Sequence, residues 1–143
     1  IARDLAPAAE VEAQFTALRA ELEALDAEAA VKLGGLSDVS IIVTHPRYEY
    51  FARRYGLSIT SLEWEAGATP ADAQIEELGV LVNATDAKMV IWEATPQEGA
   101  FELTSKLGLH NIVFPPLAQE VEGRGYIDTV RGAILAMSQA DLQ

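Results

Sequence analysis

Residues 39–57 read VSIIVTHPRYEYFARRYGL and join two different patterns. The run 40–44 is mostly β-branched, as in a buried strand, and an amphipathic helical pattern follows over 47–55, ended by Gly56. Between strand and helix lies His45, one of two histidines in 143 residues. A buried strand that ends at a polar side chain, with a helix starting at once, is typical of the edge at which α/β folds bind ligands.

The rest of the chain repeats this alternation of strand and helix. Short strands between helices of about a dozen residues indicate βαβ units. We therefore predict an α/β fold with an open four-stranded parallel sheet flanked by helices. Because the crossovers are right-handed, all strands end at one edge. That edge collects His45, the loop 63–65, Glu93 and the pair Pro115-Pro116. Further strands are predicted at 57–63, 88–92 and 111–114, and further helices at 70–83, 96–108 and 125–137.

A long amphipathic helix precedes these units. From Pro7 to Leu33 apolar residues recur at alternating spacings of four and three, acidic residues lie off this stripe, and Gly34-Gly35 favours a stop. A helix of roughly 25 residues is about 38 Å long, more than a domain of this size needs. We expect part of it to serve something outside this chain, the alternative being a long surface helix. The stripe comprises Val11, Phe15, Leu18, Leu22, Leu25, Ala29 and Leu33.

The composition limits the classes of function. A chain of 143 residues, half of them hydrophobic, suffices for one domain with a real core. The net charge of −12 argues against nucleic-acid binding, which needs clustered Lys and Arg. The chain has no cysteine, which excludes disulfides, thiolate zinc sites and thiol nucleophiles. No apolar run reaches the roughly 18 residues of a membrane span, so no transmembrane segment is predicted.

Motifs of common enzymes are missing from the sequence. It contains no Walker phosphate loop, no GxGxxG, no GxSxG and no HExxH. No serine lies at a strand-to-helix turn, where a hydrolase nucleophile is expected. We therefore predict a protein that is not an enzyme. The alternative is a small α/β enzyme that uses Glu93 and His45 as acid and base, with an unidentified substrate.

His45 is the strongest candidate for a metal ligand. An imidazole at a strand's carboxyl end offers a neutral nitrogen to zinc, and Pro46 stiffens the turn. One histidine does not make a site, because zinc takes three or four ligands, so a structural histidine is the alternative. Glu93 ends the third strand at the same edge. Its carboxylate could accept hydrogen bonds from loop amides, support His45 or bind the ion itself.

The remaining polar candidates have simpler interpretations. Glu63 and Glu65 flank Trp64, and we expect the indole to pack while both acids face water. His110 lies at a helix-to-strand turn, hence at the opposite edge of the sheet. We expect an exposed histidine there rather than a ligand.

The motifs in their order resemble the C-terminal lobe of the metal receptors, or solute-binding proteins, of zinc/manganese-type ABC importers. The resemblance covers essentially all 143 residues. It implies that residues 1–35 are the second half of the long helix that bridges the two lobes, and that 36–143 form the C-terminal α/β lobe. The stretches that carry it are ALRAELEALDAE, VTHPRYEYFARRYGL, SLEWEAGATPADAQIEEL, MVIWEATPQ and GLHNIVFPPL.

The resemblance implies a divalent metal ion bound in a cleft between two lobes. His45 maps onto the ligand from this lobe, and two histidines of the N-terminal lobe, which this chain lacks, supply others. Histidine at this position goes with zinc and glutamate with manganese, so we expect zinc, with manganese as the alternative and no organic cofactor. The implied partners are the N-terminal lobe and the permease of an ABC transporter. The implied location is periplasmic or extracellular and membrane-associated.

Pro115 departs from the family pattern. The aspartate that often supplies a fourth ligand aligns with Pro115, which cannot coordinate a metal. Three histidines plus water, or a carboxylate from the other lobe, would still make a tetrahedral zinc site. The alternative is a receptor-like binding module that has lost high-affinity metal binding. The loop 64–70 is also shorter than is usual in the family.

The chain starts at Ile1, without a methionine, inside what reads as continuing structured sequence. We therefore expect a piece of a longer protein. For that reason the missing signal peptide carries no weight against an extracytoplasmic location.

Overall fold

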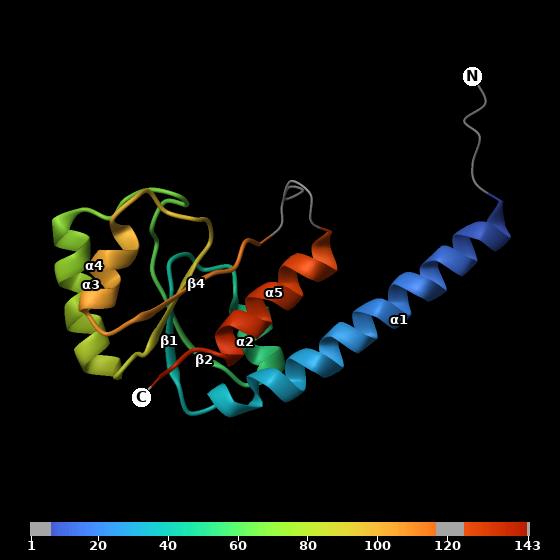
Figure 1. Ribbon diagram of the computed structural model, residues 1–143, viewed down its shortest axis with the longest axis horizontal. Helices are drawn as coiled ribbons and strands as arrows, with labels where there is room; N and C mark the ends of the chain where they lie inside the picture. Colours follow the sequence, from blue (N-terminus) through green and yellow to red (C-terminus); the bar gives the residue numbers. More distant parts are fainter. Residues whose placement is uncertain (1–6, 117–124, 143) are drawn as a thin grey trace, which may run out of the picture.

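The computed structural model describes residues 7–116 and 125–142 and contains a parallel sheet between two helical layers (Figure 1). The predicted α/β fold with a four-stranded sheet is confirmed, and the strand order is β2-β1-β3-β4. The strands are β1 (Ser40–Val43), β2 (Ser58–Ser61), β3 (Met89–Trp92) and β4 (His110–Val113). The helices are α1 (Ala8–Leu33), η1 (a 3-10 turn, Gly34–Leu36), α2 (Glu49–Tyr55), α3 (Asp72–Thr85), α4 (Ala100–Lys106) and α5 (Tyr126–Ser138).

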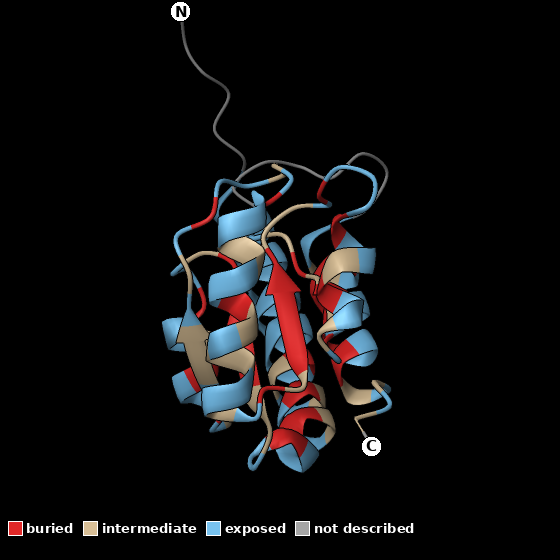
Figure 2. Cartoon of the chain, turned by 90° about the vertical axis from the view of Figure 1, so that its left-hand side faces the viewer, coloured by how far each residue is buried: buried red, intermediate tan, exposed pale blue. Residues whose placement is uncertain are grey.

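Both faces of the sheet are buried, because helices cover each of them. Successive side chains of a strand point to opposite faces and so enter different cores. Ile41, Val43 and Ile91 belong to a core shared with α1, α2 and α5. Ile42 and Val90 belong to a second core shared with α3 and α4. Figure 2 shows a strand buried along its whole length between helices whose outer faces are exposed. That strand is β3, and its neighbour β1 is buried from Ile41 to Val43, so the two inner strands form the centre of the sheet.

The sheet has a topological switch point between β1 and β3. From β1 the chain continues through α2 to β2 on one side, and from β3 it continues through α4 to β4 on the other. The parallel register pairs Val43 with Ile91, and the N–H of Thr44 still donates to the carbonyl of Ile91 at 2.9 Å. Two residues beyond that pair lie His45 and Glu93. Both candidate residues therefore follow the strands that border the crevice where open α/β sheets bind ligands.

Only the carboxyl-terminal part of α1 packs on the sheet. Leu25, Ala29 and Leu33 are buried, whereas the four preceding members of the apolar stripe are exposed. The amino-terminal half of α1 projects beyond the rest of the described chain (Figure 1). The exposed fractions are 52% for Val11, 59% for Phe15, 52% for Leu18 and 39% for Leu22.

Polar contacts attach the packed part of α1 to its neighbours. The Asp26 carboxylate accepts hydrogen bonds from the Arg54 guanidinium and, at 2.9 Å, from the Tyr55 hydroxyl, both on α2. The hydrogen bond from Arg54 lowers the pKa of Asp26, and burial raises the pKa of Tyr55 to about 12. Glu28 pairs with Arg131 of α5 at 3.0 Å. These contacts fix α1 against α2 and α5 and so set the direction in which the rest of α1 projects.

Several helix and strand ends differ from the predictions. Helix α3 begins at Asp72 rather than at Pro70, because Ala71 is extended and serves as the N-cap residue. Helix α4 begins at Ala100 rather than at residue 96, because Gly99 has a φ of 93° in the left-handed region. Strand β2 is shorter than the predicted 57–63. The predictions for residues 1–6 lie outside the described residues.

Glycines at two helix ends behave differently. Gly56 ends α2 in the left-handed conformation, with a φ of 68°, as its position predicts. Gly34 keeps a right-handed conformation, and the chain runs on into the 3-10 turn instead of stopping at a left-handed cap.

Among the helices described, none combines the length and the apolar character needed to cross a membrane.

Candidate metal site

His45 is half-buried and follows β1 at the carboxyl edge of the sheet. Its Nδ1 lies 3.2 Å from the carbonyl oxygen of Trp64. A carbonyl oxygen can only accept a hydrogen bond, so this contact requires the proton on Nδ1. In the neutral imidazole the other ring nitrogen, Nε2, then keeps its lone pair. A backbone acceptor on one nitrogen is the usual way in which proteins orient a histidine whose other nitrogen binds a metal.

The loop that carries this carbonyl is fixed by Trp64 itself. The Trp64 N–H donates to the carbonyl of Thr44 at 2.8 Å, one residue before the histidine. The indole is buried and packs on Trp92, with ring centroids 5.7 Å apart. The prediction that Trp64 packs while Glu63 and Glu65 face water is confirmed. His45 is thus held by a loop whose position depends on a buried pair of tryptophans.

Glu93 follows β3 beside the histidine, and its carboxylate is engaged by an arginine. Its backbone N–H donates to the Thr44 hydroxyl at 3.2 Å. Its Oε1 lies 2.8 Å from Nε of Arg47, and only 12% of the side chain is exposed. The contact that the structure shows for this carboxylate is an ion pair with Arg47. The expected roles of Glu93, hydrogen bonding to loop amides, support of His45 and metal binding, stay predictions.

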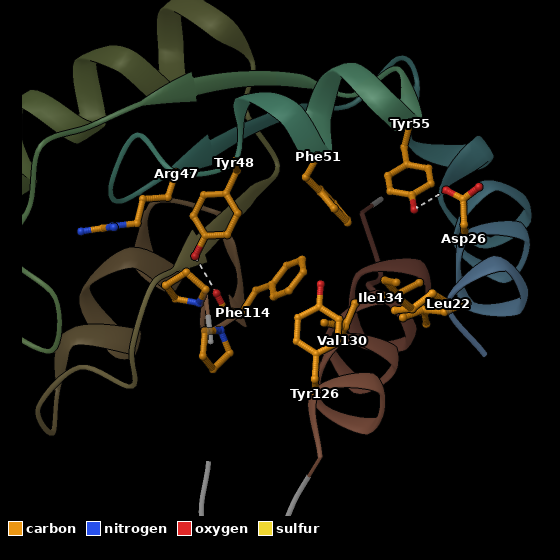
Figure 3. A pocket seen from close by; sticks show the side chains of 13 residues that line it. Leu22, Asp26, Arg47, Tyr48, Phe51, Tyr55, Phe114, Tyr126, Val130 and Ile134 are labelled. Atoms are coloured by element: carbon orange, nitrogen blue, oxygen red, sulfur yellow. Dashed lines mark hydrogen bonds between the residues drawn. The ribbon is translucent and has the colours of Figure 1, made fainter. Parts of the chain in front are cut away.

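Arg47 is the residue that sequence reasoning missed. Its N–H donates to the carbonyl of His45 at 2.9 Å, which closes a tight turn and brings its side chain back toward Glu93. About half of the side chain is exposed, and it extends away from the aromatic residues of the neighbouring cavity (Figure 3). The available signal was a cation two residues after the histidine, at the end of a strand that borders a switch point.

An aromatic cavity of about 300 Å³ lies next to this turn, between α1, α2 and α5. The Tyr48 hydroxyl donates to the carbonyl of Phe114 at 2.6 Å (Figure 3). Burial, and then the nearby Glu93 charge, raise the pKa of Tyr48 well above its usual range. Pro115 and Pro116 line the same cavity, directly after this carbonyl. The aromatic lining consists of Tyr48, Phe51, Tyr55, Phe114 and Tyr126.

The Tyr48 hydrogen bond gives a testable prediction about stability. Tyr48→Phe leaves the buried carbonyl of Phe114 without its donor, and we expect the free energy of unfolding to fall by about 1–3 kcal/mol. Tyr50→Phe is the matched control, because Tyr50 lies two residues later in the first turn of α2 and is 83% exposed. Denaturant titrations of the two variants measure the difference. Equal stabilities would contradict the assigned role of the hydroxyl.

His110 does not join His45. It is the first residue of β4 and exposed, so it lies at the amino edge of the sheet, as predicted. Within 7–116 and 125–142, no group of three or more His, Asp, Glu or Cys side chains could hold a metal ion. Since zinc takes three or four protein ligands, a zinc ion at His45 needs ligands from beyond these residues.

A parallel α/β lobe, a helix that projects from it and an oriented imidazole at the switch point define a class of protein. They fit a ligand-binding protein of the open α/β class, with its ligand at the switch point. The chain belongs to the ZnuA family, described as zinc-uptake complex component A, periplasmic, which matches residues 1–140. This is a family of metal-binding solute-binding proteins of ABC importers.

Solved structures show the same fold. The zinc-bound ZnuA-like domain of AdcA from Streptococcus pneumoniae superposes with a TM-score of 0.79 at 23% identity, over 92% of this chain and 52% of that one. The metal-dependent lipoprotein YcdH from Bacillus subtilis superposes with a TM-score of 0.77 at 22% identity, over 92% of this chain and 52% of that one. FpvC from Pseudomonas aeruginosa in complex with Mn²⁺ superposes with a TM-score of 0.65 at 20% identity, over 86% of this chain and 48% of that one. The chain therefore spans about half the length of these proteins. No match was found among curated proteins.

Proposed function

We propose that this chain is the C-terminal lobe of an extracytoplasmic receptor that binds zinc and delivers it to an ABC permease, without catalysis. The observation that carries the proposal is the contact of His45 Nδ1 with the Trp64 carbonyl, which leaves Nε2 for a metal ion. His45 also lies beside the switch point, where open α/β sheets bind their ligands. Membership of the ZnuA family supports the choice of a metal ion as ligand.

Zinc is the metal that the donor chemistry favours. Imidazole suits zinc, whereas manganese prefers carboxylate, carbonyl and water oxygens. The carboxylate of Glu93 is paired with Arg47, so of the two candidate residues His45 is the one with a free donor, a nitrogen. AdcA, whose ZnuA-like domain has this fold, was solved with zinc. Manganese remains the alternative, because FpvC has the same fold and was solved with Mn²⁺.

We propose further that residues 1–35 are the second half of a helix that bridges two lobes, and that residues 36–143 are the C-terminal lobe. Two observations support this division. The projecting half of α1 carries an exposed apolar stripe that begins at Val11 and includes Phe15, which a second lobe would cover. The chain spans about half the length of AdcA's ZnuA-like domain. A continuous helix shared by both lobes would limit their relative motion.

A receptor-like module that has lost tight metal binding is the second candidate. Pro115 favours it, because it stands where the family aspartate is expected, and so does the ion pair that engages Glu93. The two candidates differ in the preceding part of the protein. Two histidines in an N-terminal lobe support the zinc receptor, and their absence supports the module without a metal site.

Titration calorimetry tests the proposal. We expect the complete receptor to bind one zinc ion tightly and manganese more weakly, and the 143-residue chain to bind zinc weakly, because it supplies one ligand of the three or four that zinc takes. The 143-residue chain is the matched comparison, since it contains the same His45. A complete receptor that binds no divalent metal would refute the proposed function. Equal zinc affinities of the two forms would refute the division of the site between lobes.

A further inference from the structure

Glu93 places a carboxylate on the strand end next to the one that carries His45. The parallel register of β1 and β3 puts the two residues at equivalent positions, two beyond the pair of Val43 and Ile91. Neighbouring strands lie about 4.8 Å apart, so the segments that follow β1 and β3 leave the sheet side by side. The Thr44 hydroxyl accepts the N–H of Glu93 at 3.2 Å and thereby joins the two strand ends.

Arg47 engages this carboxylate instead. Its Nε lies 2.8 Å from Oε1 of Glu93, whose side chain is only 12% exposed. The turn that holds the arginine is closed by the hydrogen bond from its N–H to the carbonyl of His45. One short turn therefore presents an imidazole and, two residues later, the cation that neutralises the adjacent carboxylate. Separating a shielded charge pair costs free energy, because the carboxylate loses its counter-charge.

We propose that Arg47 determines the metal specificity of this lobe by holding Glu93 out of the metal's ligand set. The inference rests on the proposed function, because it presumes a metal ion at His45. With Glu93 paired, the two residues that follow β1 and β3 offer one free donor between them, an imidazole nitrogen, which favours zinc. With Glu93 released, the lobe would offer nitrogen and carboxylate oxygen together, a donor set better suited to manganese. The guanidinium selects against manganese without touching the ion.

The test compares variants of the complete receptor by calorimetry with zinc and with manganese. Arg47→Ala should raise the manganese affinity about tenfold and the zinc affinity less, so that the preference for zinc falls. Arg47→Ala combined with Glu93→Gln should show no such gain, because the amide is a poor ligand. Arg53→Ala is the matched control, since it removes one positive charge from an exposed position of α2. It should leave both affinities unchanged. The Mn²⁺ electron paramagnetic resonance spectrum should change with Arg47→Ala alone.

Two results would overturn the inference. One is an unchanged ratio of zinc to manganese affinity in Arg47→Ala. The other is a gain that persists when Glu93 is also replaced by Gln, because the effect would then come from the lost charge and not from a new ligand. If either result is found while His45→Ala still abolishes tight zinc binding, this inference is overturned and the proposed function is not. A wild-type receptor that binds neither metal would overturn both.

Discussion

His45→Ala in the complete receptor should lower the zinc affinity by at least about a hundredfold, beyond the range of 10- to 100-fold typical for partners outside the ligand set. In the proposed site the imidazole is one of three or four protein ligands, and alanine offers no donor in its place. The loss should be specific to binding, because His45 is only half-buried and its imidazole is hydrogen-bonded to a backbone carbonyl. Calorimetry and thermal unfolding of the zinc-free protein separate the two effects.

His110→Ala is the matched control for this prediction. It removes the same side chain from the opposite edge of the sheet, where His110 is exposed at the start of β4. We expect its zinc affinity to equal that of the wild type. Tight zinc binding that survives His45→Ala would sink the assignment of His45 as a ligand. A loss in His110→Ala of the same size would show that the assay does not report on the proposed site.

Leu33→Ala should lower the free energy of unfolding of the 143-residue chain by about 2–5 kcal/mol. Leu33 is the last residue of α1 and has no exposed surface, so alanine leaves a cavity in the core that α1 shares with the sheet. Phe15→Ala on the same helix should change the stability of this chain by less than about 0.5 kcal/mol, because the ring is 59% exposed. Denaturant titrations measure both values.

The same pair of variants tests the role of the projecting half of α1. If an N-terminal lobe covers the stripe, Phe15→Ala should cost about 3 kcal/mol or more in the complete receptor, as expected for a buried phenylalanine. Leu33→Ala should cost the same in both forms. A phenylalanine variant without effect in the complete receptor would argue for a surface helix, the alternative to an interlobe helix.

Much of the fold follows from local sequence. The mostly β-branched run at 40–44 lies between two cores, and a run of this kind fits a strand buried on both faces of a parallel sheet. The alternation of strands and helices then predicts the four-stranded sheet. The ends of elements were predicted less well. The start of α4 depends on the left-handed conformation of Gly99, and the start of α3 on the extended conformation of Ala71. Neither conformation is specified by apolar periodicity.

The candidate site was predictable only in part. His45 and Glu93 could be placed at one edge, because strand ends meet there in any parallel sheet. The contacts that these two side chains make could not be predicted, because each depends on the conformation of a loop. The carbonyl that orients His45 belongs to Trp64, nineteen residues later. The pairing of Glu93 with Arg47 depends on the turn closed at the carbonyl of His45. The role of His45 as a metal ligand stays a prediction.

The most direct test of His45 as a zinc ligand is anomalous diffraction at the zinc absorption edge from crystals of the complete receptor loaded with zinc. We predict one anomalous peak in the cleft, about 2.0–2.1 Å from Nε2 of His45, with Nδ1 still bonded to the Trp64 carbonyl. A zinc peak that lies beyond coordinating distance of His45 would contradict the account.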